Sequence, residues 1–382
     1  MPSDATLMQE HRAGADYRAI AVKYHLNPDS VRARVSRANR RQRAVNLDAP
    51  APEVRAEPKP DMAPYLQYLL IRRAIDDLPP PAPVVAPGPV DDTAAWDELI
   101  ARLSNLTRAA RILYTSDQHF PDHDPLAIRM VEDIALWYGP DLIVHGGDVF
   151  DMDAISRFQH DYRKGKQDAL RHARLPYQSH IQRLRSDNPN AAQVYIDGNH
   201  TAPRIQAYLN DHWEFADTVL DTYQALVRAN GAVMYMGAVE EVEIGGLFLQ
   251  HGRRVGKNAA RLAQDDLGGS TPMVQGHAHT PQVDVRRVRR SGGRGYRVVQ
   301  SIVNGCLCRM PAAYDKRTQQ SKWLQSVTLA HVEMDGDLVN QQLVLFHERA
   351  NGNLCAFIGK RLFEVSANAE ARPTLKMEKK VA

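Results

Sequence analysis

The chain is poor in cysteine and has no long apolar run. Only three of its 382 residues are cysteines, Cys306, Cys308 and Cys355, and no C-x-x-C pair occurs. An odd number of cysteines excludes a complete disulfide framework, so reduced structural thiols are expected. Charged residues interrupt each hydrophobic stretch well before the eighteen or so residues that a membrane span requires. Because the N-terminal MPSDATLMQEHRAG also lacks the apolar block of a secretory signal, we expect a cytoplasmic protein without a membrane partner.

The chain as a whole has no strong excess of either charge. Its net charge is +3, and hydrophobic residues make up 43% of the sequence, which is enough for a sizeable core. Residues 1–45 nevertheless hold nine basic and four acidic residues, whereas the other 337 residues hold 39 basic and 41 acidic ones. The basic character therefore belongs to the N-terminal segment.

Proline marks a linker behind this segment. Residues 46–90 contain 11 of the 23 prolines, a density that excludes helices and central strands over most of this stretch. We expect a semi-rigid linker over 46–107 with two short helices, at 65–78 and 91–108. The apolar residues of the second helix fall at helical spacing; they are Trp96, Leu99, Ile100 and Leu103.

Residues 1–45 predict a small all-α helix-turn-helix domain. Asp16 is placed to cap a first helix, and Asn27 with Pro28 to begin a second one in which Val31 and Val35 face inward. Such a second helix enters the major groove of DNA while arginines neutralise phosphates. A protein-docking role is the alternative, since small arginine-bearing helical units also bind proteins. The arginines expected to contact DNA are Arg32, Arg34, Arg37 and Arg40.

The sequence changes character at about residue 110. Short β-rich runs such as RILYTS, DLIVHGG and AQVYID alternate with helical stretches such as LAIRMVEDIALWY, and strands dominate after residue 282. This alternation predicts an α/β domain, which we place at 108–366. The remaining residues, 367–382, are expected to form a loose tail.

Polar side chains follow five of the β-rich runs directly. Ligands of open α/β sheets bind beyond the carboxyl ends of the strands, so these side chains are expected to share one edge. Oxygen and nitrogen ligands without thiolate suit Mn, Fe, Zn, Ni or Mg, and a bridging carboxylate can hold two such ions about 3.5–4 Å apart. The residues are Asp117, His119, Asp148, Asn199, His200, His251, His277 and His279.

The five blocks DQH, GGDVFD, GNH, QHG and GHAH resemble the signature blocks of the calcineurin-like metallophosphoesterase superfamily, in order and spacing, over roughly residues 110–310. The resemblance implies a two-layer β-sandwich flanked by helices with a dinuclear metal centre at its edge. It assigns His200 to the substrate, as a proton donor or a stabiliser of phosphate charge. One metal would be held by Asp117, His119, Asp148 and His279, and the other by the bridging Asp148 with Asn199, His251 and His277.

Some neighbouring residues depart from the family pattern or leave their role open. Many relatives carry an acid where Thr201 stands, so His200 is either a weaker acid here or is oriented by another carboxylate. Asp151 fits the second acid of GGDVFD, as a metal ligand or as a supporting or capping group. Arg204 is placed to pair with a substrate phosphate or to form a salt bridge. His145 precedes the strand end, and we expect it to be structural.

These observations predict a hydrolase of phosphoric esters, a phosphodiesterase or nuclease acting on DNA through a metal-activated hydroxide. Two divalent ions are implied, Mn²⁺ before Fe, Zn, Ni or Mg. The combination of domains resembles phage or prophage phosphoesterases, which would act in the bacterial or host cytoplasm. Two alternatives stay open: a phosphomonoesterase with a docking module, and a non-enzymatic DNA-binding protein with a vestigial site. The basic segments 156–180 and 284–297 are either nucleic-acid contacts or solvated surface.

Overall fold

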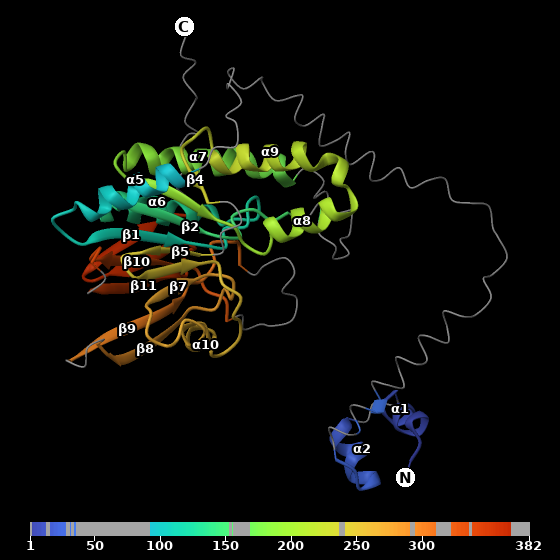
Figure 1. Cartoon of the computed structure of the whole chain (residues 1–382). Helices are drawn as coiled ribbons and strands as arrows, with labels where there is room; N and C mark the ends of the chain where they lie inside the picture. Colours follow the sequence, from blue (N-terminus) through green and yellow to red (C-terminus); the bar gives the residue numbers. More distant parts are fainter. Residues whose placement is uncertain are drawn as a thin grey trace. The chain divides into compact units, whose positions relative to one another are not determined.

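The computed structural model describes residues 2–12, 16–27, 31, 34–35, 92–152, 155, 169–236, 241–290, 295–310, 322–335 and 338–367. These belong to two compact units, Met1–Leu66 and Gln67–Ala382 (Figure 1). Most of the proline-rich stretch, including the helix expected at 65–78, lies outside the described residues, as does the expected C-terminal tail from 368. Within the described parts of the chain, none of the helices has the length and apolarity needed to span a membrane.

The N-terminal unit contains the helices α1 (Asp4–Arg12) and α2 (Tyr17–Tyr24). Asp16 caps α2 as predicted, because its Oδ1 accepts a hydrogen bond from the Ala19 amide at 2.7 Å. His25 ends α2 in the left-handed conformation. The first helix was not predicted from the sequence. A small apolar core joins the helices to the segment after His25; its buried members are Leu7, Ile20, Ala21, Val31 and Val35.

Only one of the four arginines expected to contact DNA lies among the described residues. The Nη2 of Arg34 donates a hydrogen bond to the carbonyl oxygen of Pro2 at 2.8 Å, which ties the segment after α2 to the start of the chain. Arg32, Arg37 and Arg40 lie outside the described residues. The burial of Val31 and Val35 agrees with the predicted inward face, and DNA binding by this unit stays a prediction.

The second unit is built on two β-sheets with flanking helices, as the α/β prediction requires. The larger sheet has the order β13-β12-β11-β10-β1-β2-β3-β4, and the smaller one β5-β6-β7-β9-β8. Strands β1, β2 and β3 are parallel, and so are β6, β7 and β9. The larger sheet consists of β1 (Ala110–Thr115), β2 (Leu142–Gly146), β3 (Ala192–Ile196), β4 (Met234–Tyr235), β10 (Ser326–Val332), β11 (Val339–Glu348), β12 (Leu354–Ile358) and β13 (Arg361–Val365). The smaller one consists of β5 (Glu241–Ile244), β6 (Leu247–Gln250), β7 (Met273–Gln275), β8 (Gln282–Arg289) and β9 (Tyr296–Val303).

Alternate residues of the central strands face two different cores. Leu113 packs with the helices on one side, whereas its neighbours Ile112 and Tyr114 pack against the smaller sheet. Figure 1 shows this layering, with several helices on one side of the larger sheet, and with the smaller sheet and the helix at 259–266 on the other. The helices are α5 (Thr93–Ser104), α6 (Pro125–Tyr138), α7 (Ala169–Asp187), α8 (Ala202–Asp211), η4 (Trp213–Phe215), α9 (Ala216–Arg228) and α10 (Ala259–Asp266).

Helix α5 confirms the helix predicted at 91–108 and is slightly shorter. Leu99 and Leu103 are buried in the core between the sheets, and Trp96 and Ile100 pack against it. The amphipathic spacing therefore predicted both the helix and its inner face. Because β1, β2 and β3 are covered on both sides, their residues are almost all buried, which is the usual state of parallel strands.

Candidate metal centre

Five strands deliver the candidate ligands to one edge of the two sheets. Strands β1, β2 and β3 of the larger sheet end there, as do β6 and β7 of the smaller one. Each strand is followed within four residues by one or two of the side chains singled out from the sequence. Asp117 and His119 follow β1, Asp148 follows β2, Asn199 and His200 follow β3, His251 follows β6, and His277 and His279 follow β7.

The backbone at these strand ends is strained. Eight described non-glycine residues have positive φ angles, and five of them are candidate ligands. Such left-handed conformations cost of the order of 1–3 kcal/mol each and persist where the surrounding structure imposes them, typically at functional sites. The five φ values are 54° for Asp117, 52° for His119, 48° for Asp148, 69° for His277 and 54° for His279. Because these residues cluster at one edge, the placement of their side chains there outweighs the free-energy cost of the left-handed backbone conformation.

Asp117, His119 and His279 form the first group of converging ligand atoms. The Nε2 of His279 lies 3.0 Å from Asp117 Oδ1 and 3.3 Å from the Nε2 of His119. All three residues are buried, and their ligand atoms lie within 4.8 Å of one another. Two ring nitrogens that face each other need either a hydrogen-bonded proton or a metal cation between them.

The second group consists of Asp148, His251 and His277, with Asn199 beside it. The Nδ1 of His251 lies 3.0 Å from the carbonyl oxygen of Gly146, to which it can only donate. This leaves Nε2 of His251 facing Asn199 Oδ1 at 2.8 Å and Asp148 Oδ2 at 3.1 Å. A carbonyl oxygen that fixes the tautomer and leaves the other nitrogen for a cation is the usual support of a metal-binding histidine.

Glycines make room for the carboxylates and one imidazole. A Cβ atom at Gly198 would lie 2.2 Å from Asp148 Oδ1, and one at Gly276 would lie 2.4 Å from Asp117 Oδ2. At Gly147 it would lie 2.5 Å from the ring of His251. The glycine before Asn199 is therefore needed because the Asp148 carboxylate passes directly over its backbone.

The electrostatics of the site favour bound positive charge. Burial by itself lowers the pKa of His119, but Asp151 and the charge of Asp148 outweigh it and raise the pKa to about 10. Burial likewise opposes protonation of His251, yet Asp148 raises its pKa to about 9. The pKa of Asp148 would rise on burial, but the charge of His251 holds it well below its usual range. A proton on each of these imidazoles thus supplies the positive charge that a metal cation would supply beside the carboxylates.

The donor set fits divalent metal ions. Two carboxylates, an amide oxygen and four imidazoles converge, and oxygen and nitrogen donors of this kind suit Mn, Fe or Zn. The Nε2 atoms of His119 and His279 already face each other at 3.3 Å, while the Nδ1 of His119 lies 3.7 Å from Asp151 Oδ2. The structure thus brings together all seven residues proposed as ligands, and their metal binding stays a prediction.

His200 lies beside the two groups, and Asp151 orients it. The Nδ1 of His200 lies 3.0 Å from Asp151 Oδ1, while its backbone amide donates to Asp148 Oδ1 at 2.7 Å. Its ring meets the ring of His119 edge to face, with centroids 4.8 Å apart. Asp151 therefore supplies the carboxylate that Thr201 does not. With Nδ1 engaged, Nε2 is the nitrogen left for a substrate.

Asp151 also binds Arg204. The Nη1 of Arg204 lies 2.7 Å from Asp151 Oδ1, and Asp151 Oδ2 lies 3.7 Å from Nδ1 of His119. Its oxygens converge with ring nitrogens of His119 and His200 within 4.8 Å, so the carboxylate is placed both to support these histidines and to reach a metal ion. Arg204 forms a largely buried salt bridge, one of the two roles expected for it, and its contact with a phosphate stays a prediction.

Sequence reasoning missed the network that holds the turn after β3. Asp197 accepts hydrogen bonds from the hydroxyl groups of Tyr223, of Tyr235 at 2.6 Å, and of Thr201 at 3.0 Å. The Thr201 hydroxyl oxygen also accepts from the Gly198 amide at 3.2 Å. Thr201 therefore fixes the turn that presents Asn199 and His200. The only signal in the sequence was the unusual acid before GNH, because the tyrosines come from distant elements.

Two other predictions concern residues around the site. His145 is fully buried in β2 and its Nε2 lies 3.1 Å from Gln193 Oε1, so its role is structural as predicted. The three cysteines are free and buried, also as predicted. Nothing in the sequence pattern indicated that Cys306 and Cys308 place their sulfur atoms within 4.8 Å of a ring nitrogen of His279.

Comparisons with known proteins add little to this geometry. No protein-family model matches the chain, and neither does any curated protein. Among solved structures, a single mutant of Vps29 from Entamoeba histolytica is 13% identical, with a TM-score of 0.29, and the match covers 68% of this chain and 99% of that one. YfcE, a phosphoesterase from E. coli, is 15% identical, with a TM-score of 0.29 and coverage of 61% and 98%. The protein TT1561 of Thermus thermophilus is 11% identical, with a TM-score of 0.26 and coverage of 61% and 98%.

Proposed function

We propose that the chain is a phosphoesterase of the calcineurin-like metallophosphoesterase superfamily that cleaves phosphodiester bonds in DNA with two divalent cations, preferably Mn²⁺. The observation that supports this most strongly is the pairing of the two ligand groups. Asp117, His119 and His279 form one, and Asp148 with His251 and His277 forms the other. These groups agree with the sets that the five sequence blocks imply, and the resemblance assigns Asp148 to both metals. When bound, the cations would supply Lewis-acid activation of water and neutralise the phosphate.

The residues of the chain have separate tasks in this reaction. Asp117 and Asp148 carry the negative charge that attracts the cations, and the buried surroundings strengthen that attraction. Asn199 contributes a neutral oxygen, which keeps the net negative charge low enough for a phosphate to approach. His200 is about 20% exposed at its side chain and is the imidazole that faces outward beside the ligands. It holds a proton for the departing oxygen, while Asp151 keeps its ring in place.

The preference for a DNA diester over a monoester comes from the N-terminal unit. A basic segment with a capped helix and its own core has no evident use for a small phosphomonoester, whereas it would add affinity for a polyanion. A monoesterase that uses the same unit for protein docking is the second candidate. A vestigial centre is disfavoured because none of the seven ligand positions has lost a donor atom.

A substrate panel tests the proposal. Purified protein loaded with Mn²⁺ is expected to hydrolyse bis(p-nitrophenyl) phosphate and DNA, and to lose both activities with chelator and regain them with added Mn²⁺. Metal content is measured on the same samples. Faster turnover of a phosphate monoester would favour the second candidate. Absence of both metal and hydrolysis would leave only a DNA-binding protein.

Deletion of residues 1–90 is expected to separate targeting from chemistry. Hydrolysis of the small diester should stay nearly unchanged, because the ligands and His200 all lie in the second unit. Binding to duplex DNA should weaken, and its log–log salt dependence should flatten by about 4–5 if the unit neutralises about five phosphates at roughly 0.9 each. Full-length Arg37→Ala with Arg40→Ala is the milder companion. Equal affinity of the truncated and full chains at each salt concentration would make the N-terminal unit a docking module.

A further inference from the structure

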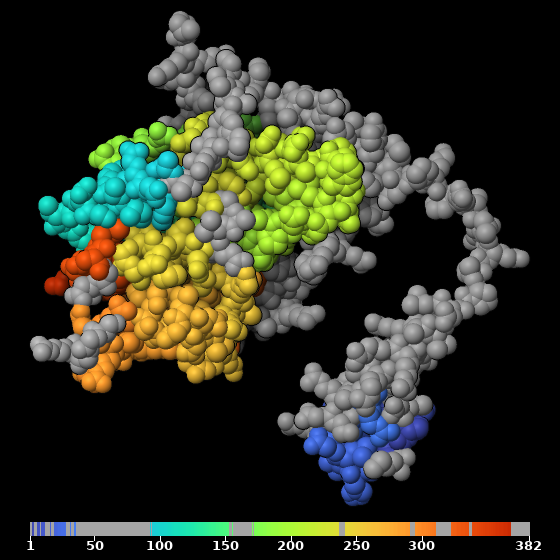
Figure 2. Space-filling model, viewed as in Figure 1, coloured from blue at the N-terminus to red at the C-terminus, as the bar shows by residue number. Residues whose placement is uncertain are grey.

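The two strands β8 and β9 form a ribbon with one covered and one open face. They pair antiparallel from Gln282 opposite Val303 to Arg289 opposite Tyr296. The rest of the smaller sheet supports only the inner end, since β7 pairs with β9 at Ser301 to Val303. The outer half therefore has β8 and β9 as its only strands among the described residues. In the space-filling view, the orange segment that contains the ribbon forms an outer edge of the second unit (Figure 2).

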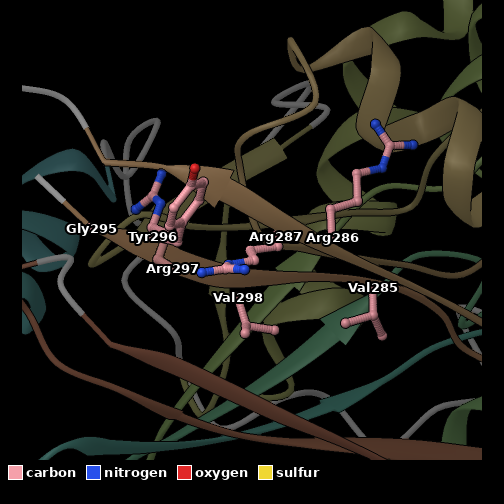
Figure 3. A pocket seen from close by; sticks show the side chains of 7 residues that line it. All are labelled: Val285, Arg286, Arg287, Gly295, Tyr296, Arg297 and Val298. Atoms are coloured by element: carbon pink, nitrogen blue, oxygen red, sulfur yellow. The ribbon is translucent and has the colours of Figure 1, made fainter. Parts of the chain in front are cut away.

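The covered face of the ribbon packs against α10 and the loop behind it. Arg286 pairs with Asp265 of α10 at 2.6 Å and with Asp284 at 2.7 Å. Arg297 donates to the carbonyl oxygen of Ser270 at 2.8 Å. These arginines are engaged by the protein itself, and Figure 3 shows Arg286 pointing to the side of the ribbon opposite Val285.

The open face combines exposed apolar, aromatic and basic side chains. Val285, Tyr296 and Val298 are 57%, 53% and 65% exposed. Together with Arg287 they line a hollow of about 500 Å³, to which Arg286, Gly295 and Arg297 also contribute (Figure 3). The guanidinium of Arg287 lies over the ring of Tyr296, 4.0 Å from its centroid. Arg289, directly opposite Tyr296, is exposed as well. Strand alternation places no carboxylate on this face of the two strands, because Asp284 belongs to the covered one.

We propose that this open face binds a nucleic-acid strand by stacking an unpaired base on Tyr296 and by pairing phosphates with Arg287 and Arg289. The exposed ring of Tyr296 lies under the guanidinium of Arg287 and next to valines and Arg289. This composition is typical of surfaces on which the bases of a single strand stack. If a second copy of the chain docked here through the same face, it would bring arginines against arginines and no carboxylate. Charge complementarity therefore favours a polyanion over self-association.

The topology fixes how this platform relates to the metal centre. Strand β9 ends at Val303, and the next amide, of Asn304, bonds to Gln275 just before His277. Tyr296 lies seven residues earlier, about 23 Å along the strand. At the B-form rise of about 3.4 Å per nucleotide this distance corresponds to about seven nucleotides, and an extended unpaired strand spans it with fewer. This deepens the proposed function, since it gives the enzyme a second contact with long substrates only.

The test measures binding to the full-length protein in chelator, where no hydrolysis occurs. The probes are oligothymidylate of about 20 nucleotides, which exceeds the site size of most single-strand modules, and a duplex of the same length. Tyr296→Ala should weaken oligothymidylate binding at least about fivefold, and Tyr296→Phe should not. Arg287→Ala with Arg289→Ala should lower the salt slope by about 1.4, from roughly 0.7 per phosphate.

Arg361→Ala is the matched control. Arg361 is exposed on a strand of another hairpin, and its guanidinium lies over the ring of Phe363, 5.2 Å from the centroid, much as Arg287 lies over Tyr296. This variant should bind as the unaltered protein does. The proposal is overturned if Tyr296→Ala binds oligothymidylate normally, if the duplex loses affinity equally, or if only self-association in sedimentation changes. Hydrolysis of bis(p-nitrophenyl) phosphate should be normal in all these variants. If the unaltered protein hydrolyses no phosphoester, the proposed function fails, while the binding assay still decides the platform.

Discussion

Asp148→Asn is expected to cost the chain both its bound metal and nearly all of its hydrolytic activity. Asp148 is buried, its Oδ2 faces His251 at 3.1 Å, and its Oδ1 accepts from the His200 amide at 2.7 Å. An amide offers one oxygen and no charge, so it cannot hold two cations together. Loss of a group that merely supports a ligand typically costs 10–100-fold in metal affinity or activity, and loss of the shared carboxylate should exceed about 100-fold.

The fold should survive this substitution. Asn has nearly the shape of Asp and tolerates the left-handed conformation that Asp148 adopts, at φ 48°. Without the carboxylate, burial favours neutral His251, so no uncompensated charge is left inside. Circular dichroism of the metal-free variant should therefore match that of the unaltered protein.

Thermal unfolding with and without Mn²⁺ gives a readout that does not depend on turnover. A ligand at 100 times its Kd stabilises the folded state by about 2.7 kcal/mol, so the unaltered protein should melt higher with Mn²⁺. Asp148→Asn should lose most of that increase, whereas Asp217→Asn, at the exposed start of α9, should keep it. If Asp148→Asn retains two metals per chain and near-normal turnover, the assignment of ligands is wrong.

The sequence predicted which side chains meet at the sheet edge, because each placement depends on local information. A β-rich run followed by Asp, Asn or His places that side chain at a strand end, and parallel strands bring their ends to one edge. Asp117, Asp148 and His251 were found in this way, from a few residues each. The same locality predicted α5, whose apolar spacing selects Leu99 and Leu103 for the core.

The supporting contacts were out of reach because they join distant segments. Asp151 and His200 are 49 residues apart, and Asp197 meets Tyr235 across 38 residues. Nothing in the pattern around Asp151 tells whether its carboxylate turns toward a metal or away from it. The antiparallel contact of β10 with β1, more than 200 residues apart in sequence, was hidden for the same reason. The short helix α1 was not predicted from the sequence, because Leu7 is the one residue that it contributes to the small core and it therefore shows no apolar periodicity.

His200→Gln is expected to slow the release of poor leaving groups while leaving the metals in place. General acid catalysis is typically worth 10²–10⁴-fold, and that loss should appear with nucleotide esters, whose alkoxide needs a proton. A p-nitrophenyl ester leaves readily without one, so its hydrolysis should fall only slightly. The measurement is kcat on both substrates, with metal content determined beside it. An equal loss on both would mean that His200 binds phosphate charge, and loss of metal would make it a ligand.

Asp151→Asn should reproduce part of this effect through His200. Its carboxylate lies 3.0 Å from His200 Nδ1, and the amide keeps the shape of Asp151 while it removes the charged acceptor that holds this ring. It also stands behind His119, so metal affinity should fall 10–100-fold, and turnover has to be compared at saturating Mn²⁺. Under that condition the loss should again be larger for the poor leaving group.

The double variant decides whether Asp151 acts on the leaving group through His200. If it does, adding Asp151→Asn to His200→Gln should change the ratio of the two substrate rates very little, because the residue being oriented is already gone. Additive losses in that ratio would instead mean that Asp151, or Arg204 bound to it at 2.7 Å, contacts the substrate independently. Arg204→Lys separates these two, since a lysine keeps the charge beside Asp151 but loses the fork that pairs with a phosphate. A normal rate ratio in Arg204→Lys would confine Arg204 to holding Asp151.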